Sequence, residues 1–320
     1  MGRQLTIIET ADWLRERDNY LILTHRRPDG DTVGCAGALA QGLREIGKTA
    51  YILDNPEITP RYSQFVDDCW VPDGFKPDHV IIVDTATFDL FPKNGDEYKD
   101  TVSLCIDHHP SNPLYAEYNC MDVTTASCGE VIYEILIALS GSISEKSAER
   151  LYVAVSTDSG CFAFANTTAN TLRVASLLVE AGAPNRKLNR LLFRTKTRAR
   201  MKIESMIVAG LELHFDGKVA ISSITNEMMA AANADEDDVD DIASMPGTVE
   251  GVLAGITIRE MTSTQDCKVS VRTSPLVDAH AISEHFGGGG HQMASGFSLE
   301  KSIPEIKELL LEVLKKSFPD

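Results

Sequence analysis

The stretch Thr24–Gly34 reads THRRPDGDTVG and follows directly on the apolar run Tyr20–Leu23. It places one histidine and two aspartates, His25, Asp29 and Asp31, within a single short turn. Pro-Asp-Gly-Asp is a favourable turn sequence by itself, because Pro fixes φ, Gly permits positive φ and Asp hydrogen-bonds to its own backbone. The stretch alone leaves two interpretations open, a solvated turn and a ligand-binding turn, and the rest of the chain decides between them.

The chain has 320 residues, which is enough for two domains, and its 43% hydrophobic and 24% charged residues are typical of a globular protein. Seven scattered cysteines form no C-x-x-C pair, which favours free thiols in a reducing cytoplasm over disulfides or a zinc site. No secretory signal is visible at the N-terminus, and the longest apolar stretch is far shorter than the ~20 residues of a membrane span. We therefore expect a cytoplasmic protein without a membrane partner.

The formal net charge of −17 restricts the partners of the chain. Non-specific affinity for nucleic acids depends on neutralising phosphates, so an acidic chain disfavours long duplex nucleic acid. A small phosphorylated nucleotide held by a few arginines or a metal ion is compatible with this charge.

The first ~190 residues alternate short apolar runs with helical patterns, which predicts an α/β domain with a doubly wound, mostly parallel sheet and helices on both faces. The expected strands are Tyr20–Thr24, Ala50–Leu53, Val80–Val83 and Val102–Ile106. The expected helices are Ile7–Arg17, Val33–Glu45, Gly129–Leu139, Ser144–Val155 and Ala169–Ala181.

A long connecting helix is predicted over Asn189–Leu213, and a smaller α/β domain follows it. The domains are thus expected at residues 1–190 and 214–320, with the helical linker at 191–213. The linker carries a basic cluster, for which a solvated face is favoured over a phosphate-facing surface. In the second domain we expect a solvated acidic run, two strands and two helices, at Ala234–Asp241, Val249–Glu260, Asp266–Thr273, Asp278–Phe286 and Pro304–Lys316.

Acidic and imidazole side chains follow four separate elements of the first domain. Besides the opening turn they are Asp84 after an apolar strand, the Asp107–His108–His109 triplet after another, and Asp158 after a helix. Ligands of an open α/β sheet bind at the rim formed by the carboxyl ends of its strands, so these side chains can converge there. Converging carboxylates repel one another unless cations lie between them. Two divalent ions resolve the repulsion, and oxygen and imidazole ligands suit Mn²⁺.

Each of these residues also has an ordinary structural interpretation. Asp84 alone is compatible with a strand-end turn, His108 and His109 with ordinary polar positions, and Asp158 with a helix N-cap. The conjunction of all four places, rather than any one of them, favours a two-metal centre.

The motifs as a set resemble the DHH family of phosphoesterases. H-x-x-P-D-G-D stands at His25–Asp31, the strand-end aspartate at Asp84, D-H-H at Asp107–His109 and T-D-S-G at Thr157–Gly160. The second domain resembles the DHH-associated domain, with G-G-G-H-x-x-A-S-G at Gly288–Gly296. The resemblance spans nearly the whole chain and favours the ligand-binding interpretation of the opening turn.

The resemblance implies two Mn²⁺ ions per chain, with Mg²⁺ or Co²⁺ as alternatives. One ion would be held by His25, Asp29 and Asp84, and the other by Asp31, Asp84, His108 and Asp158, so that Asp84 bridges. Asp107 would orient a neighbouring side chain. His109 would lie near the substrate phosphate as a proton donor or oxyanion partner.

The second domain is expected to bind the substrate phosphate. The glycine run before His291 is a candidate anion-binding nest of backbone N–H groups, with a flexible turn as the alternative. Arg272 ends an alternating strand, and its guanidinium can hold a phosphate bidentately. By resemblance, the phosphate-binding residues are Arg272, Ser274, Gly288, Gly289, Gly290 and His291, facing the metals across an interdomain cleft.

Length and layout resemble the nanoRNase/pAp-phosphatase branch of the family. The resemblance implies hydrolysis of short oligoribonucleotides to mononucleotides, removal of the 3′-phosphate of pAp, or both, through attack of a metal-bridged hydroxide on phosphorus. A stand-alone cyclic di-AMP or pApA phosphodiesterase, a catalytically silent nucleotide-binding regulator and a polyphosphate-directed enzyme remain as alternatives. Many relatives form dimers, so a homodimer is also open, although no stretch identifies an interface.

Overall fold

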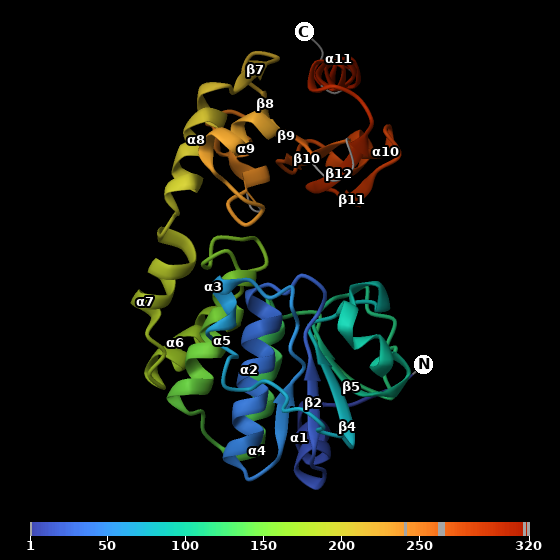
Figure 1. Ribbon diagram of the computed structural model, residues 1–320, viewed down its shortest axis with the longest axis vertical. Helices are drawn as coiled ribbons and strands as arrows, with labels where there is room; N and C mark the ends of the chain where they lie inside the picture. Colours follow the sequence, from blue (N-terminus) through green and yellow to red (C-terminus); the bar gives the residue numbers. More distant parts are fainter. Residues whose placement is uncertain (1, 240–241, 262–265, 316–317, 319–320) are drawn as a thin grey trace. The chain divides into compact units, whose positions relative to one another are not determined.

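The structure is a computed structural model that describes residues 2–239, 242–261, 266–315 and 318 (Figure 1). It comprises two compact units, Met1–Thr195 and Lys196–Asp320, and each contains a six-stranded sheet. Across the described part of the chain, no helix combines the length and apolarity that crossing a membrane requires. All seven cysteines lie among the described residues as free thiols.

The sheet of the first unit is parallel and has the strand order β1-β6-β5-β4-β2-β3. Its strands are β1 (Arg3–Gln4), β2 (Tyr20–Leu23), β3 (Ala50–Ile52), β4 (His79–Val83), β5 (Val102–Asp107) and β6 (Tyr118–Met121). The chain passes from β2 to β3 and then returns to the other side of β2 as β4. A topological switch point, where open α/β sheets bind ligands, therefore lies between β2 and β4. The predicted α/β fold with a parallel sheet is confirmed.

The two faces of this sheet are covered differently. One face and its helices share the larger core, and these helices are α1 (Ile7–Glu16), α2 (Gly30–Glu45), α4 (Cys128–Ser140), α5 (Glu145–Asp158) and α6 (Ala169–Glu180). On the other face Leu21, Ile82 and Cys105 belong to a smaller cluster with Phe91 and Tyr98. That face carries the 3-10 segments η1 (Phe88–Leu90) and η2 (Lys93–Thr101) and loops in place of the predicted α-helices. The short helix α3 (Pro60–Ser63) lies beside α2.

Helices α2 and α5 pack closely because small residues face each other. A Cβ atom at Gly34 would lie 2.4 Å from the carbonyl oxygen of Arg150 and 2.9 Å from the Cβ of Ala154, so only glycine fits there. Since α2 begins next to Asp29 and α5 ends at Asp158, this close approach brings two distant acidic segments together.

The prediction of one connecting helix over Asn189–Leu213 is wrong. The segment forms α7 (Asn185–Asn189), the π-helical η3 (Arg190–Arg194) and, after a break, α8 (Arg198–Ala209). The break has a local cause: Thr197 is extended, and its hydroxyl accepts a hydrogen bond from the amide of Arg200 at 2.8 Å as the N-cap of α8.

The second unit has the strand order β11-β12-β10-β9-β8-β7, in which β8 and β9 pair in parallel and the other neighbours are antiparallel. The strands are β7 (Glu212–His214), β8 (Val219–Ile224), β9 (Ala254–Glu260), β10 (Cys267–Thr273), β11 (Gly289–His291) and β12 (Ala294–Leu299). The helical segments are α9 (Asn226–Ala232), η4 (Ile242–Thr248), α10 (Ala279–Glu284) and α11 (Ile303–Leu314).

Two predictions for this unit need correction. The strand predicted from Val249 begins at Ala254, because Gly251 has a φ of 84° and interrupts an extended backbone. The acidic run is not wholly solvated, since Asp238 is buried and its carboxylate accepts hydrogen bonds from the Thr197 hydroxyl and the amide of Asp235. Residues 240–241 of that run lie outside the described residues.

Candidate metal centre

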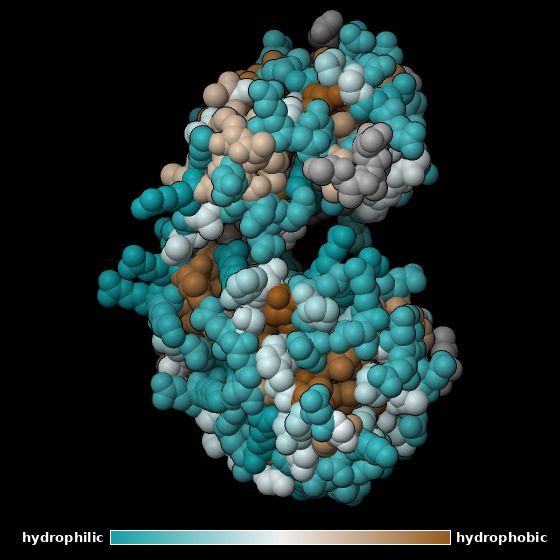
Figure 2. Space-filling model, viewed as in Figure 1, coloured by the Kyte–Doolittle hydropathy of each residue, from teal (hydrophilic) through white to brown (hydrophobic). Residues whose placement is uncertain are grey.

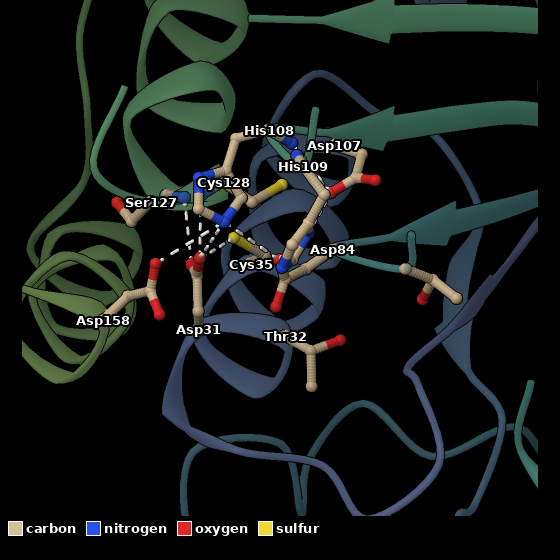
Figure 3. A network of polar contacts seen from close by, with 12 residues as sticks. Asp31, Thr32, Cys35, Asp84, Asp107, His108, His109, Ser127, Cys128 and Asp158 are labelled. Carbon is tan, nitrogen blue, oxygen red and sulfur yellow. Dashed lines mark hydrogen bonds and ion pairs between the residues drawn. The ribbon is translucent and has the colours of Figure 1, made fainter. Parts of the chain in front are cut away.

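The candidate site lies at the carboxyl ends of β2, β4 and β5, three adjacent strands of the parallel sheet. The opening turn follows β2, Asp84 follows β4, and the Asp107–His109 triplet closes β5. Asp158, the last residue of α5, completes the group. Figure 3 shows Asp31, Asp84, His108 and Asp158 directed toward one another. All eight sequence-predicted residues of the first unit therefore lie in one place.

The turn after β2 serves as both a helix start and part of the site. Asp29 is the N-cap of α2, and its Oδ1 accepts hydrogen bonds from the amides of Asp31 and Thr32 at 3.0 and 3.2 Å. The same oxygen lies 3.5 Å from Nε2 of His25. The turn interpretation and the ligand interpretation are thus compatible, because capping fixes the carboxylate beside the histidine.

Asp84 lies between two groups of potential ligands. Its Oδ2 is 3.7 Å from Nε2 of His25, and its Oδ1 is 3.5 Å from Nε2 of His108. The carboxylate is buried, and Oδ1 has no hydrogen-bond partner among the described residues. Its backbone φ is 52°, a left-handed conformation that Asp tolerates better than most residues and that is found at functional sites. A buried carboxylate oxygen without a donor fits a cation.

The tautomers of two histidines are set by backbone carbonyls. Nδ1 of His25 lies 2.9 Å from the carbonyl oxygen of Arg26, and Nδ1 of His108 lies 3.4 Å from that of Thr125. Each Nδ1 therefore donates its proton, which leaves the Nε2 lone pair directed toward the carboxylates. Metal-binding histidines are held in this way.

The second group consists of Asp31, His108 and Asp158. Nε2 of His108 is 3.8 Å from Asp31 and 3.5 Å from Asp158. The buried Asp31 carboxylate accepts hydrogen bonds from the amides of Cys128 and Gly129 at 2.7 and 3.0 Å, at the start of α4. Asp158 ends a helix, so the alternative that it is an N-cap is excluded.

The electrostatics of these carboxylates favour a bound cation. Burial, followed by repulsion from neighbouring aspartates, raises the pKa values of Asp31 and Asp84 well above the usual range. The same causes raise the pKa of Asp158 to about 6. A divalent cation would reverse these shifts, since it stabilises the ionised carboxylates.

Within the described residues, the side-chain atoms form three groups that are compact enough to hold a metal ion. One of them, His25–Asp29–Asp84, contains the same residues as the first set implied by the family resemblance, and another, Asp31–His108–Asp158, contains three of the four residues of the second set. The third combines Asp84 and His108 with His109, whose Nδ1 is 2.7 Å from Oδ1 of Asp107. That contact requires a proton on Nδ1, so Nδ1 cannot bind a metal at the same time.

Asp107 holds the triplet in place. Its Oδ1 accepts hydrogen bonds from the amides of His108 and His109 as well as from the His109 ring. Its Oδ2 accepts one from Nδ2 of Asn112 at 2.8 Å. Burial opposes ionisation of Asp107, but these hydrogen bonds outweigh it and lower its pKa, and the same contact with Asp107 raises the pKa of His109.

Asn112 and two backbone amides of α4 support the site and were not predicted from the sequence. Asn112 follows the triplet by three residues within the motif CIDHHPSN, and an amide so close to a buried aspartate is a usable signal. The amides of Cys128 and Gly129 carry no such signal, because backbone donors acquire a role only when tertiary structure brings α4 next to Asp31.

In the second unit, Arg272, Ala294 and His291 form one row across the strands β10, β12 and β11. Residues paired in this way point to the same face, so the alanine leaves space between the two larger side chains. Nη1 of Arg272 donates to the carbonyl oxygens of Val271 and Ser295, and burial lowers its pKa. Ser274 follows β10, where its amide donates to the carbonyl oxygen of Leu253 at 2.8 Å.

The glycine run is more ordered than a nest of free N–H groups. The amides of Gly287 and Gly288 donate to the carbonyl oxygens of Glu284 and Ser283, so they are not available to an anion. Gly289 and Gly290 belong to β11, where they pair with β12. Close approach to β12 requires glycine at Gly288, where a Cβ would lie 2.3 Å from the carbonyl oxygen of Gly296, but a Cβ at Gly289 would meet nothing within 4 Å.

A parallel α/β sheet with carboxylates and imidazoles gathered at its switch point is typical of enzymes that carry out metal-assisted phosphoryl chemistry. The family models agree: the DHH family, N-terminal domain matches residues 19–155, and the DHHA1 domain matches residues 216–318. The chain belongs to the DHH family of phosphoesterases, which are hydrolases acting on phosphoester bonds.

Relatives cover nearly the whole chain. The bifunctional oligoribonuclease and PAP phosphatase NrnA of Thermus thermophilus is 29% identical over 302 residues, which cover 93% of this chain and 89% of that protein. The protein of the same name from Bacillus subtilis is 25% identical over 291 residues, covering 88% and 90%. Among solved structures, an exopolyphosphatase-related protein from Bacteroides fragilis has a TM-score of 0.84 at 20% identity, covering 98% and 97%, and shares the fold.

Proposed function

We propose that this enzyme hydrolyses short oligoribonucleotides to mononucleotides and removes the 3′-phosphate of pAp. The names of both relatives above support this substrate class. The observation that carries the proposal is Asp84, whose two oxygens face two separate histidine-containing groups at 3.7 and 3.5 Å. Such a bridging carboxylate is what a pair of ions requires.

His25, Asp29 and Asp84 would hold one divalent ion, and Asp31, Asp84, His108 and Asp158 the other. Carboxylate and imidazole donors without a thiolate favour Mn²⁺, with Mg²⁺ or Co²⁺ as alternatives. When bound, the two ions neutralise charge on the phosphate and lower the pKa of an attacking water.

His109 is the proposed proton donor. Its Nδ1 is bound to Asp107, so Nε2 is the ring atom left to exchange a proton with the substrate. The raised pKa keeps a larger fraction of the ring protonated near neutral pH. On the second unit, the row formed by Arg272 and His291 supports phosphate binding, because a guanidinium beside an imidazole across a small residue offers several donors.

Assays of purified protein test this proposal. With Mn²⁺ present we expect release of mononucleotides from dinucleotides and pentanucleotides, release of phosphate from pAp, and much slower turnover of polyphosphate. Preference for pApA would favour the phosphodiesterase alternative. Absence of turnover on every substrate, with metal content confirmed, would favour the silent regulator and contradict the proposal.

A further inference from the structure

The second group of the candidate centre consists of three residues that are far apart in the sequence. Asp31 lies on α2, His108 follows β5, and Asp158 ends α5. A part of the chain that contacts all three would hold them at the distances that an ion requires. Residues 125–129, which lead from the end of β6 into the first turn of α4, make contact with each of them, directly or through one side chain.

Two of these contacts are made by the backbone of residues 125–129 alone. The carbonyl oxygen of Thr125 lies 3.4 Å from Nδ1 of His108. The amides of Cys128 and Gly129 donate hydrogen bonds to the carboxylate of Asp31 at 2.7 and 3.0 Å. Figure 3 shows Cys128 next to Asp31. The same five residues therefore orient one imidazole and one carboxylate of the second group.

The third contact is made through the side chain of Asn166, which lies in the loop between α5 and α6. Its Nδ2 donates hydrogen bonds to the carbonyl oxygens of Ala126 and Asp158, each at 3.1 Å. One side-chain amide thus joins the end of α5 to residues 125–129. Loss of this amide would free the backbone of Asp158 from the part of the chain that orients the other two ligands.

Glu130 holds residues 125–129 from α4. Its side chain is only 1% exposed, and it forms no ion pair with any residue that the structure describes. Its Oε1 accepts hydrogen bonds from the amide of Ala126 and the hydroxyl of Thr171 at 2.9 Å each, and its Oε2 accepts one from Nδ2 of Asn170 at 3.0 Å. Burial of a carboxylate is costly unless such hydrogen bonds compensate for the lost water. This carboxylate therefore fixes the amide of Ala126 against the first turn of α6.

The geometry of the peptide bond carries this constraint to His108. The amide of Ala126 and the carbonyl of Thr125 belong to the same planar peptide group, so the direction of one sets the direction of the other. Glu130 accepts from the N–H side of this group, and Nδ1 of His108 faces its oxygen side. Glu130 thereby orients the imidazole without touching it.

We propose that Glu130 and Asn166 are positioning residues for the second ion. Through residues 125–129 they hold the second group in place, independently of the first group, His25, Asp29 and Asp84. The inference rests on the proposed function and adds to it the residues that determine the affinity for one of the two ions. The competing interpretation is that these hydrogen bonds stabilise only the fold, in which case their loss would not distinguish between the ions.

Titration calorimetry of the full chain with Mn²⁺ tests the inference in two backgrounds. His25→Ala removes a ligand of the first group only, and His108→Ala removes a ligand of the second group only. Asn166→Ala should weaken Mn²⁺ binding about tenfold in the His25→Ala background, the usual effect of losing a residue that orients a ligand, and leave it unchanged in the His108→Ala background.

Glu130→Gln provides a second variant of similar volume. Its side-chain oxygen can still accept from the amide of Ala126, but its nitrogen cannot accept from Asn170. We therefore expect the same selectivity for the second ion with a smaller loss of affinity, about threefold, as for one neutral hydrogen bond.

Asn94→Ala is the matched control. Asn94 is also exposed, and its side-chain amide donates to a backbone carbonyl oxygen, that of Asp54, which lies after β3. Neither this substitution nor Asn166→Ala alters the apolar core of the first unit, whose surface is mostly hydrophilic in the view of Figure 2. Thermal unfolding confirms that the variants are folded.

Four results would overturn the inference: equal weakening in both backgrounds, no weakening in either, equal weakening by Asn94→Ala, or no Mn²⁺ binding in the His25→Ala background. The last result counts because the second group is inferred to be held independently of the first. Failure of the proposed function would be seen separately. The wild-type protein would then bind two Mn²⁺ ions without turnover of oligoribonucleotides or pAp, while the selective effect of Asn166→Ala persisted.

Discussion

At the scale of single residues, the site depends on carboxylates that are unfavourable without a cation. Asp84 is buried, has a left-handed backbone and leaves Oδ1 without a hydrogen-bond donor in the described structure. The negative charge of Asp31 is stabilised in part by hydrogen bonds from two backbone amides of α4. Because Asp84 is the residue proposed to contact both ions, we expect its substitution to reduce turnover more than that of any other residue of the centre.

Asp84→Asn tests this expectation with little change in volume. We expect turnover to fall about a thousandfold, or ~4 kcal/mol in transition-state stabilisation, because the bridging charge is lost. Steady-state kinetics and metal content by mass spectrometry measure the effect, and the exposed Asp73→Asn is the control. More than a few per cent of wild-type turnover with both ions still bound would argue against a bridging role.

The variant Asp107→Asn tests the role of His109 as the proton donor. Asp107 raises the pKa of His109, so its loss should lower that pKa and move the alkaline limb of the kcat profile to lower pH. The shift has this direction because His109 must be protonated to donate a proton. With a lower pKa, its ring loses that proton at a lower pH. A pH profile that keeps its alkaline limb while kcat falls would indicate that Asp107 acts only on structure.

At the scale of elements, the centre depends on how helices meet. Helix α2 carries Asp31, and α5 ends in Asp158. At Gly34 the two helices are so close that no side chain fits between them. Separation of the helices would separate two proposed ligands of one ion.

Gly34→Ala tests this coupling. An added methyl would lie 2.4 Å from a backbone oxygen of α5, so we expect a loss of about 1–3 kcal/mol in the free energy of unfolding together with weaker Mn²⁺ binding. Gly247→Ala is the control, since a Cβ there meets nothing within 4 Å. Urea denaturation and calorimetric titration with Mn²⁺ provide the two measurements, and unchanged metal affinity in a destabilised variant would show that the helices do not set the site.

The strands that carry the candidate site can be predicted from the sequence, whereas several other strands of the two sheets cannot. β2, β4 and β5 are buried apolar runs, so their hydrophobic pattern identifies them. β6 and β12, with sequences YNCM and ASGFSL, are rich in small and polar residues and lack that pattern. The break at Thr197 was missed because helical periodicity continues on both sides of it, and only the capping hydrogen bond reveals the boundary.

For the candidate site, the residues that meet could be predicted from the sequence, but the orientation of their side chains could not. Seven of the eight residues of the candidate centre belong to motifs placed at strand ends, which can be predicted to meet because parallel strands share one rim, whereas Asp158 ends the helix α5. The orientation of His25 and His108 could not be predicted, since it depends on the carbonyls of Arg26 and Thr125. The engaged amides of Gly287 and Gly288 likewise depend on the end of α10 rather than on local sequence.

At the scale of the whole molecule, we expect metal binding and folding to be coupled through the protons of the buried carboxylates. The pKa values of Asp31, Asp84 and Asp158 are raised in the folded, metal-free chain, so the folded state retains protons that the unfolded state has released. For Asp158 this stability is fully present below about pH 4 and is lost as the pH rises through about 6.

Metal addition should therefore stabilise the protein in a pH-dependent way. We expect Mn²⁺ to raise Tm more at about pH 7.5 than at about pH 5, because protons compete with the ions for these carboxylates. EDTA should abolish turnover, and Mn²⁺ should restore it. Scanning fluorimetry measures Tm, and an equal shift at both pH values would show that these carboxylates do not bind the ions.

Anomalous diffraction at the manganese edge, from crystals of the full chain grown with Mn²⁺, tests the two-metal centre most directly. The predicted result is two peaks, one beside His25, Asp29 and Asp84 and the other beside Asp31, Asp84, His108 and Asp158. Absence of ordered manganese at this rim, with ions bound elsewhere, would contradict the account.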